Sequence, residues 1–189
     1  MSRVSREHAA KNRAKVVAVA STLFRRKGLD GIGIRELMAE AGLTQGGFSG
    51  QFGSKEALAG EACADAFDGA ERDLRAAIKG EDAGRLHRLA ELYFSSDPPG
   101  DNCPMATLAG DAARAPAGGP VRQAFTAGLR RLAHAIAGEK PDDKGLAIMA
   151  AMVGAAVLRR ASDDAALADA IEAAVLRLAG TDGTDGATS

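Results

Sequence analysis

The sequence predicts an all-α protein, on the basis of three observations. Apolar residues recur every three or four positions along nearly the whole chain of 189 residues, which is the period of an α-helix. Ala, Leu, Val and Gly supply most of the apolar bulk, whereas aromatic residues make up only 4% of the chain and Trp is absent. No segment shows the apolar–polar alternation of a strand. We therefore expect about nine helices.

The net charge of −1 hides an uneven distribution along the chain. Residues 1–55 carry 10 Lys and Arg against 4 Asp and Glu, whereas residues 56–189 carry 14 against 21. A basic amino-terminal third on an acidic remainder indicates that one end meets a polyanion such as a nucleic acid. A lopsided surface on an ordinary soluble protein is the alternative.

Several classes of protein are disfavoured by composition. No stretch reaches the roughly 18 apolar residues that span a bilayer, and the first residues lack the apolar core of a signal peptide, so we expect a cytoplasmic protein with no membrane partner. Cys63 and Cys103 form no CxxC pair and the three His residues show no metal spacing. We therefore expect free thiols and no metal or other cofactor. No base–nucleophile pair or phosphate loop stands at a recognisable spacing, which argues against an enzyme.

The expected helices fall into two groups. Three short helices, at about residues 10–27, 34–41 and 45–52, precede a longer one that runs from about residue 55 to Ile78. Five further helices follow, interrupted by the loops SSDPPGDN (95–102), PAGGP (116–120) and GEKPDDKG (138–145), and the tail at 181–189 is expected to be disordered. The expected helix ends are Gly28 and Gly42 as terminating glycines and Thr44, Ser54 and Ser162 as caps.

The three short helices have the lengths of a helix-turn-helix module, with AGLT as the turn between the second and third. Phe48 and Phe52 stand at i and i+4 and are expected to face inward. A helix that enters a DNA major groove must bring its own backbone close to base edges, and glycines at 46 and 47 remove the side chains that would hold it off. Each Gly lowers helix stability by about 1 kcal/mol relative to Ala, so three in one short helix indicate a function.

Two other interpretations of this stretch remain open. Residues 42–53 are also compatible with a glycine-rich loop between two core helices. A phosphate cradle for a nucleotide fits less well, because there is no GxxxxGK[ST] motif and no preceding strand. On the DNA-binding interpretation, Gln45 contacts base edges and the remaining polar groups contact phosphate oxygens. The predicted DNA contacts are Arg35, Thr44, Gln45, Gly46, Gly47, Ser49, Gln51 and Lys55.

Residues 14–62 resemble the DNA-binding domain of the TetR family of bacterial transcriptional regulators. The resemblance is carried by A..LF...G in the first helix, I..LM..AGLT across the second helix and the turn, and GGF...F.SKEAL in the third helix and the start of the fourth. It implies a homodimer that binds a palindromic operator in double-stranded DNA, usually to repress, and that a small molecule releases. Residues 1–56 then form the DNA-binding domain, with the fourth helix from about residue 55 as the link, and residues 57–180 the ligand-binding and dimerisation domain.

Three positions depart from the family pattern. Ser49 stands where the family commonly has Tyr, Gln51 where it commonly has His, and Gly33 where a Thr or Ser often caps the second helix. All three family residues typically touch phosphate. We therefore expect somewhat fewer contacts with the DNA backbone.

The resemblance also assigns roles to the later helices. A pocket walled by Met and aromatic residues adapts to varied apolar ligands, although ordinary core packing is the alternative for each residue. The predicted ligand-binding residues are Phe67, Tyr93, Phe94, Met105, Leu108, Phe125, Leu129, Met149 and Met152. GLAIMAAMVGAAVL (145–158) is apolar around most of its surface, as expected at a dimer interface or for a helix buried within one monomer. The predicted interface residues are Leu146, Met149, Val153, Val157, Leu167, Ile171 and Leu178.

Cys103 begins the predicted sixth helix, where free N–H groups and the helix dipole lower a thiol pKa. An electrophile or oxidant sensor is conceivable there, and a simple packing role is the alternative. The fourth helix begins at Lys55 and is the natural lever between ligand and DNA. Two other function classes are an enzyme that uses Cys103 or a His, and a DNA-compacting protein of low sequence specificity.

Overall fold

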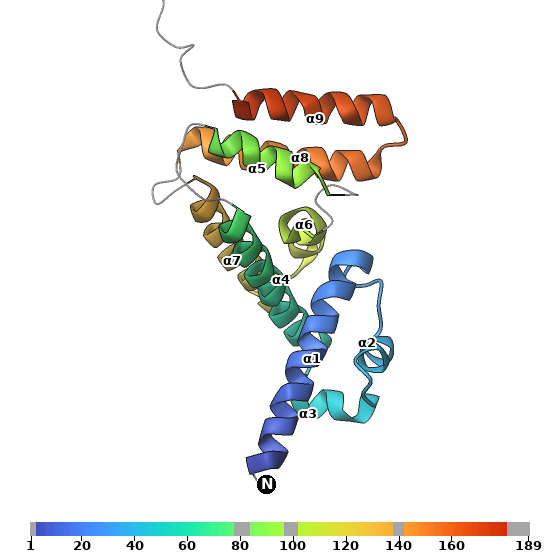
Figure 1. Ribbon diagram of the computed structural model, residues 1–189. Coiled ribbons are helices and arrows are strands. Elements are labelled where there is room, and N and C mark those ends of the chain that lie inside the picture. The colour runs from blue at the N-terminus through green and yellow to red at the C-terminus, as the bar shows by residue number, and fades with distance from the viewer. Residues whose placement is uncertain (1–2, 78–83, 97–101, 138–141, 181–189) are drawn as a thin grey trace, which may run out of the picture. The chain divides into compact units, whose positions relative to one another are not determined.

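The computed structural model describes residues 3–77, 84–96, 102–137 and 142–180 (Figure 1). Within these ranges every regular element is helical and none is a strand, so the predicted all-α class is confirmed. No helix in the described ranges has both the length and the hydrophobicity to cross a bilayer. The tail at 181–189, predicted to be disordered, lies outside the described residues. The elements are α1 (Arg3–Lys27), α2 (Ile34–Glu40), the 3₁₀ helix η1 (Gln45–Gly47), α3 (Phe48–Phe52), α4 (Lys55–Ala77), α5 (Arg85–Phe94), α6 (Pro104–Arg114), α7 (Pro120–Ala137), α8 (Asp143–Ala161) and α9 (Ala165–Gly180).

The helices form two compact units. Unit 1 contains Met1–Gly69 and Thr107–Leu129, and unit 2 contains Ala70–Ala106 and Arg130–Ser189. Helices α4, α6 and α7 each contribute one part to unit 1 and the other part to unit 2. The predicted functional boundary at residue 56 concerns DNA and ligand binding and stays a prediction.

Unit 1 is built on the buried faces of α1 and α2. Val16, Ala20 and Phe24 recur along one side of α1 and are almost fully buried, as are Leu37 and Met38 of α2. Gly28 and Gly42, which follow these helices, have φ values of +75° and +67°. A left-handed conformation at these two positions lets the chain turn sharply after each helix, as the sequence predicts.

The capping of α4 also follows the prediction, whereas that of the preceding turn does not. Ser54 Oγ accepts a hydrogen bond from the Ala57 N–H at 3.0 Å, which satisfies one of the free donors at the start of the helix. Thr44 occupies the N-cap position of η1, but its side chain makes no capping bond there. Gly33 occupies the N-cap of α2 in an ordinary extended conformation and supplies no side-chain cap.

Four predicted elements differ from the structure. Helix α1 begins at Arg3 rather than near residue 10. Residues 3–15 are rich in Ala, Arg and Lys, which favour a helix, but they have no apolar stripe that would have predicted it. The predicted third helix is a 3₁₀ turn followed by a short α-helix, in line with the low helix propensity of its glycines. Helix α8 begins at Asp143, inside the predicted loop, because Asp142 Oδ1 caps it by accepting from the Gly145 N–H. Asp164, not Ser162, caps α9, and its Oδ1 accepts from the Leu167 N–H at 3.0 Å.

In unit 2, α9 packs on both α8 and α5, and α5 also contacts α8 (Figure 1). Helices α8 and α9 are joined by the short turn at residues 162–164, so they run side by side in opposite directions. Ile148 and Ala156 of α8 are fully buried, and Ala168, Val175 and Ala179 of α9 are nearly so. The small side chains of Ala156, Ala168 and Ala179 let the helices approach closely.

Candidate DNA-binding surface and ligand cavity

The segment Gln45–Phe52 has one apolar face and one open face. Phe48 and Phe52 are only 4% and 6% exposed, and their ring centroids lie 5.6 Å apart. On the other side Gly46 is exposed, and a Cβ added to it or to Gly50 would meet no atom within 4 Å. The inward orientation of the two rings, predicted from their i, i+4 spacing, is confirmed. The open face therefore offers bare peptide groups to whatever approaches.

Four of the predicted DNA contacts surround one groove in unit 1. They are Gln45, Gly46, Ser49 and Lys55, and the same groove is lined by Ile34, Phe48, Gly53 and Ser54. Arg35, Thr44 and Gly47 are exposed beside it. Gln51 differs, because its side chain is half-buried and its Oε1 is buried, with no hydrogen-bond partner among the described residues. Its Nε2 would lie 3.8 Å from a Cβ at Gly47, so this amide folds back along the helix rather than outward.

Arg13 of α1 joins three parts of unit 1. Its guanidinium lies over the Phe52 ring, with Cζ 4.8 Å from the ring centroid. One terminal nitrogen forms an ion pair with Glu61 of α4 at 2.5 Å, and Nε donates to the Gln51 carbonyl oxygen at 3.4 Å. No periodic pattern in the sequence marks this residue, since it lies before the apolar stripe of α1. Its contacts hold α1, α3 and α4 in one arrangement.

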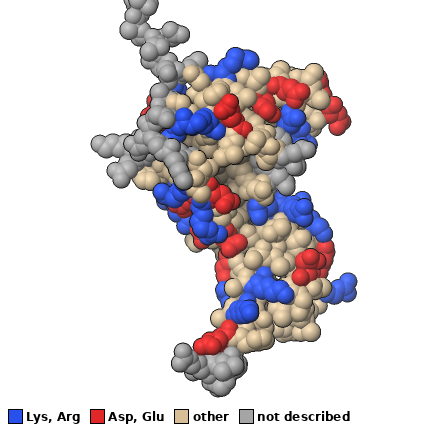
Figure 2. Space-filling model, viewed as in Figure 1, with Lys and Arg blue, Asp and Glu red and all other residues tan. Residues whose placement is uncertain are grey.

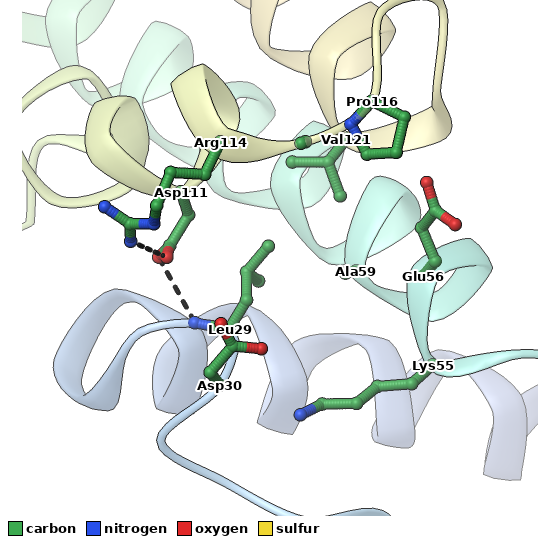
Figure 3. A pocket seen from close by; sticks show the side chains of 10 residues that line it. Leu29, Asp30, Lys55, Glu56, Ala59, Asp111, Arg114, Pro116 and Val121 are labelled. Atoms are coloured by element: carbon green, nitrogen blue, oxygen red, sulfur yellow. Dashed lines mark hydrogen bonds and ion pairs between the residues drawn. The ribbon is translucent and has the colours of Figure 1, made fainter.

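Asp111 connects α6 to the end of α1 (Figure 3). Its side chain is only 9% exposed, Oδ2 accepts from the Leu29 N–H at 3.2 Å, and Oδ1 accepts from Arg114 at 2.6 Å. Figure 3 shows the carboxylate pointing toward the turn at Leu29, at the edge of a pocket of about 330 Å³ within unit 1. Sequence reasoning missed this contact, because a single Asp in an Ala-rich helix carries no periodic signal.

A second cavity, of about 340 Å³, lies within unit 2. Its wall is mainly apolar and includes four predicted ligand-binding residues: Tyr93, Met105, Met149 and Met152. The other lining residues are Ala70, Asp73, Leu74, Ala77, Leu89, Leu92, Ser96, Asn102, Cys103, Leu132 and Ile136. Leu89, Leu132 and Ile136 stand at helical spacing on apolar faces in the sequence. This spacing predicts that they are buried, but it does not predict that they line a cavity.

The structure does not bring the other five predicted ligand residues to this cavity. Phe67 and Phe125 pack edge to face in unit 1, with ring centroids 5.3 Å apart, and a Cβ at Gly128 would lie 2.1 Å from the Phe67 ring. Phe94 is buried beside Tyr93 without lining the cavity. Leu108 and Leu129, like Phe67 and Phe125, belong to unit 1. Helical periodicity predicts which positions are buried, but it does not predict whether they are buried in the core of unit 1 or of unit 2.

The two thiols have different surroundings. Cys63 is buried in α4, and burial raises the pKa of its thiol to about 12. Cys103 is half-buried at the wall of the unit 2 cavity. Burial, and next the neighbouring Cys103, raise the pKa of the Tyr93 phenol well above its usual range. Both Tyr93 and Cys63 are therefore protonated near neutral pH.

Comparison with known proteins places the chain in a family. A model of the DNA-binding domain described as "Bacterial regulatory proteins, tetR family" matches residues 16–62. A second, described as "Tetracyclin repressor-like, C-terminal domain", matches residues 81–181. The second match alone covers more than half of the chain. The protein belongs to the TetR family. It is a transcriptional regulator, not an enzyme, with a DNA-binding domain and a ligand-binding domain.

Solved structures agree with this TetR-family assignment at the level of the fold. Reduced NemR of E. coli aligns at a TM-score of 0.71 and 18% identity, over 87% of this chain and 95% of that chain. A TetR-family regulator from Agrobacterium tumefaciens aligns at 0.71 and 20%, over 89% and 97%. The multidrug binding protein EbrR, complexed with imidazole, aligns at 0.65 and 19%, over 92% and 93%. No curated protein sequence matches the chain.

Helices α8 and α9 of this TetR-family chain carry several exposed apolar side chains. Large apolar side chains are rarely exposed in a group, yet Val157 is 40% exposed and Leu167 53%. Leu158, absent from the predicted interface, is also 53% exposed. The predicted interface residues Met149, Val153 and Ile171 are half-buried. Leu146 and Leu178 complete the set of exposed predicted residues.

Proposed function

We propose that this regulator is a cytoplasmic, homodimeric repressor that binds a palindromic operator and leaves it when a small, largely apolar ligand binds. The observation that carries the proposal is the open face of Gln45–Phe52. Exposed glycines there allow close approach of the backbone, while Phe48 and Phe52 fix the opposite face in the core. A segment with this asymmetry suits insertion into the major groove, where base edges carry the sequence information.

The proposed contacts divide by chemistry. Gln45 is exposed and donates and accepts at a base edge, adenine being the best match for its amide. Thr44, Ser49 and Lys55 supply hydroxyl and ammonium groups for phosphate oxygens. Gly46 and Gly47 contribute their backbone. Arg35 and Gln51 complete the proposed set, and Gln51 needs to turn outward from its half-buried position to take part.

The proposed dimer uses the apolar face of α8 and α9. The recognition segment is Gln45–Phe52. Two copies of it enter successive major grooves only if they stand about 34–36 Å apart, one turn of DNA, and a symmetric dimer sets that spacing. The exposed Leu146, Val157, Leu158, Leu167 and Leu178 supply the apolar area that an interface between copies needs. Burial of this face also explains why so many large apolar side chains stand in solvent in a single chain.

The proposed effector site is the unit 2 cavity. About 340 Å³ lined by Met, Leu and one Tyr fits a small apolar ligand, and the flexible methionines accommodate several shapes. Helix α4 carries Lys55 at its first residue and Leu74 at the cavity wall. A ligand that shifts this helix alters the spacing of the two recognition segments, with a coupling free energy of about 1–3 kcal/mol.

Selection of bound DNA from a random pool tests the proposal. We expect a single palindrome whose half-sites lie about 10 base pairs apart or a multiple of this distance, bound by a species of twice the chain mass in light scattering. Ligand and operator should weaken each other's binding in titration calorimetry. A DNA-compacting protein would instead enrich no sequence and protect long, irregular stretches in footprinting. Either that result or a monomer on the operator would contradict the proposal.

A further inference from the structure

Helix α1 begins well before the residues that the first family model matches. The helix begins at Arg3, whereas the family match begins at residue 16. Residues 3–15 contain five basic residues against one acidic residue, Glu7. Three full turns of helix ahead of the matched residues thus carry a net charge of +4. The five basic residues are Arg3, Arg6, Lys11, Arg13 and Lys15.

These turns continue past the recognition segment rather than covering it. Figure 1 shows the amino-terminal end of α1 running on beyond α3 within unit 1. At a rise of 1.5 Å per residue, the ten residues from Arg13 back to Arg3 span about 15 Å. Stacked base pairs are about 3.4 Å apart, so this length matches roughly four base pairs of duplex.

The direction of this segment is set by contacts with the recognition helix itself. Arg13 stacks on Phe52, pairs with Glu61 and donates to the Gln51 carbonyl oxygen. Phe52 and Gln51 belong to α3, so these contacts fix the direction of α1 relative to α3. When α3 binds DNA, the amino-terminal part of α1 therefore has a defined direction. A rigid extension loses less conformational entropy on binding than a flexible tail does.

Lys11 and Lys15 of this segment are exposed to solvent, whereas Arg13 is half-buried. Lys11 and Lys15 stand one turn apart on α1, at positions i and i+4. Lys15 Nζ lies at the helix-turn-helix turn, 3.5 Å from where a Cβ at Gly42 would stand. Figure 2 shows Lys and Arg side chains over α1 on the face turned to the viewer. Positive charge therefore continues from the recognition turn along the extension.

We propose that residues 3–15 form a basic arm that binds the phosphate backbone of duplex DNA flanking each half-site. The inference rests on the proposed function, because it requires α3 to dock on DNA. Phosphate contacts carry no sequence information, so the arm raises affinity for any flanking sequence and lengthens the protected site by about four base pairs on each side.

Substitution of the arm with neutral residues tests this inference. The variant Arg3→Gln, Arg6→Gln, Lys11→Gln keeps Arg13 and its contacts. Each lost phosphate contact lowers the magnitude of the slope of log affinity against log salt concentration by about 0.9. For a dimer that loses three contacts in each subunit, we therefore expect this magnitude to fall by up to about 5. We expect a shorter hydroxyl-radical footprint at the outer edges and an unchanged half-site sequence.

A matched control removes the same charge elsewhere. Arg26, Arg72 and Arg130 are exposed, and Arg26 stands at the opposite end of α1. Their replacement by Gln should leave the footprint as it is and change the slope by less than 1, because exposed charges beyond a Debye length of about 8 Å are largely screened. Circular dichroism of both variants confirms that they are folded.

The outcomes separate the two proposals. If wild-type protein selects no DNA sequence, the proposed function itself fails. If wild-type protein binds a palindrome but the arm variant shows the same slope and footprint as the control variant, the arm inference is overturned and the proposed function stands. A loss of slope confined to the arm variant, with shortened outer protection, supports the inference.

Discussion

The Asp111 carboxylate in α6 accepts a hydrogen bond from the Leu29 N–H, 82 residues earlier in the chain (Figure 3). Leu29 follows Gly28, whose left-handed conformation ends α1. This contact joins the turn after α1 to α6 within unit 1. A buried carboxylate that satisfies a backbone donor is expensive to remove.

Replacement of Asp111 by Ala should lower the free energy of unfolding by about 1–3 kcal/mol, because the Leu29 N–H is left without its acceptor. Arg114 contributes little to this loss, since its side chain is 71% exposed. Urea denaturation followed by circular dichroism measures the change. The exposed Asp163 is the matched control, and equal stability of the Asp111→Ala and Asp163→Ala variants would contradict the assigned role.

The Cys63 thiol should resist modification in the folded protein. Its pKa of about 12 keeps it protonated, and the thiolate is the reactive species. In a Cys103→Ala variant at pH 8, a disulfide reagent such as 5,5′-dithiobis(2-nitrobenzoate) should modify Cys63 only as fast as the protein unfolds. Modification that is fast under native conditions and unchanged by denaturant would show that Cys63 is accessible.

The same pKa shift predicts the sign of a pH effect on stability. Above about pH 9 the unfolded thiol loses its proton whereas the folded thiol keeps it, so the unfolded state binds fewer protons. The free energy of unfolding therefore falls as pH rises from about 9 to 12. A Cys63→Ala variant should show a shallower fall over this range, measured by urea denaturation at each pH.

Filling the unit 2 cavity should weaken binding of a small apolar probe. Leu74 lines the cavity and Ala76 on the same helix does not, so Leu74→Trp and exposed Ala76→Trp form a matched pair. We expect Leu74→Trp to weaken binding of the neutral fluorophore N-phenyl-1-naphthylamine at least about tenfold, which corresponds to about 1.4 kcal/mol. Equal affinities of the two variants would place the probe elsewhere.

The sequence predicted the fold more completely than the cavity. Helical periodicity and terminating glycines located all the main helices, and the spacing of Phe48 and Phe52 predicted which face of the recognition segment is buried. The cavity was only partly foreseen, since Met149 and Tyr93 line it but Phe67 does not. A buried position on a long helix such as α4 belongs to one core or the other according to packing between distant segments, which periodicity does not encode.

The contacts of single polar residues were also not predicted from the sequence. Arg13 and Asp111 each organise several elements, yet neither stands in a pattern. Their effects arise from partners 38 to 82 residues away in the chain. Such contacts become visible only once the chain is folded.

The proposed DNA binding depends most on Gly46 and Gly47, whose lack of side chains lets the backbone approach DNA. A Gly46→Ala, Gly47→Ala variant tests it, because neither position requires a left-handed conformation and a Cβ meets only the end of the Gln51 side chain. Ala should raise stability slightly, since it has the higher helix propensity. We predict an unchanged or higher Tm together with at least about tenfold weaker operator binding, while Gly110→Ala in α6 leaves binding unaltered. Wild-type operator affinity in the double variant would contradict this role of Gly46 and Gly47.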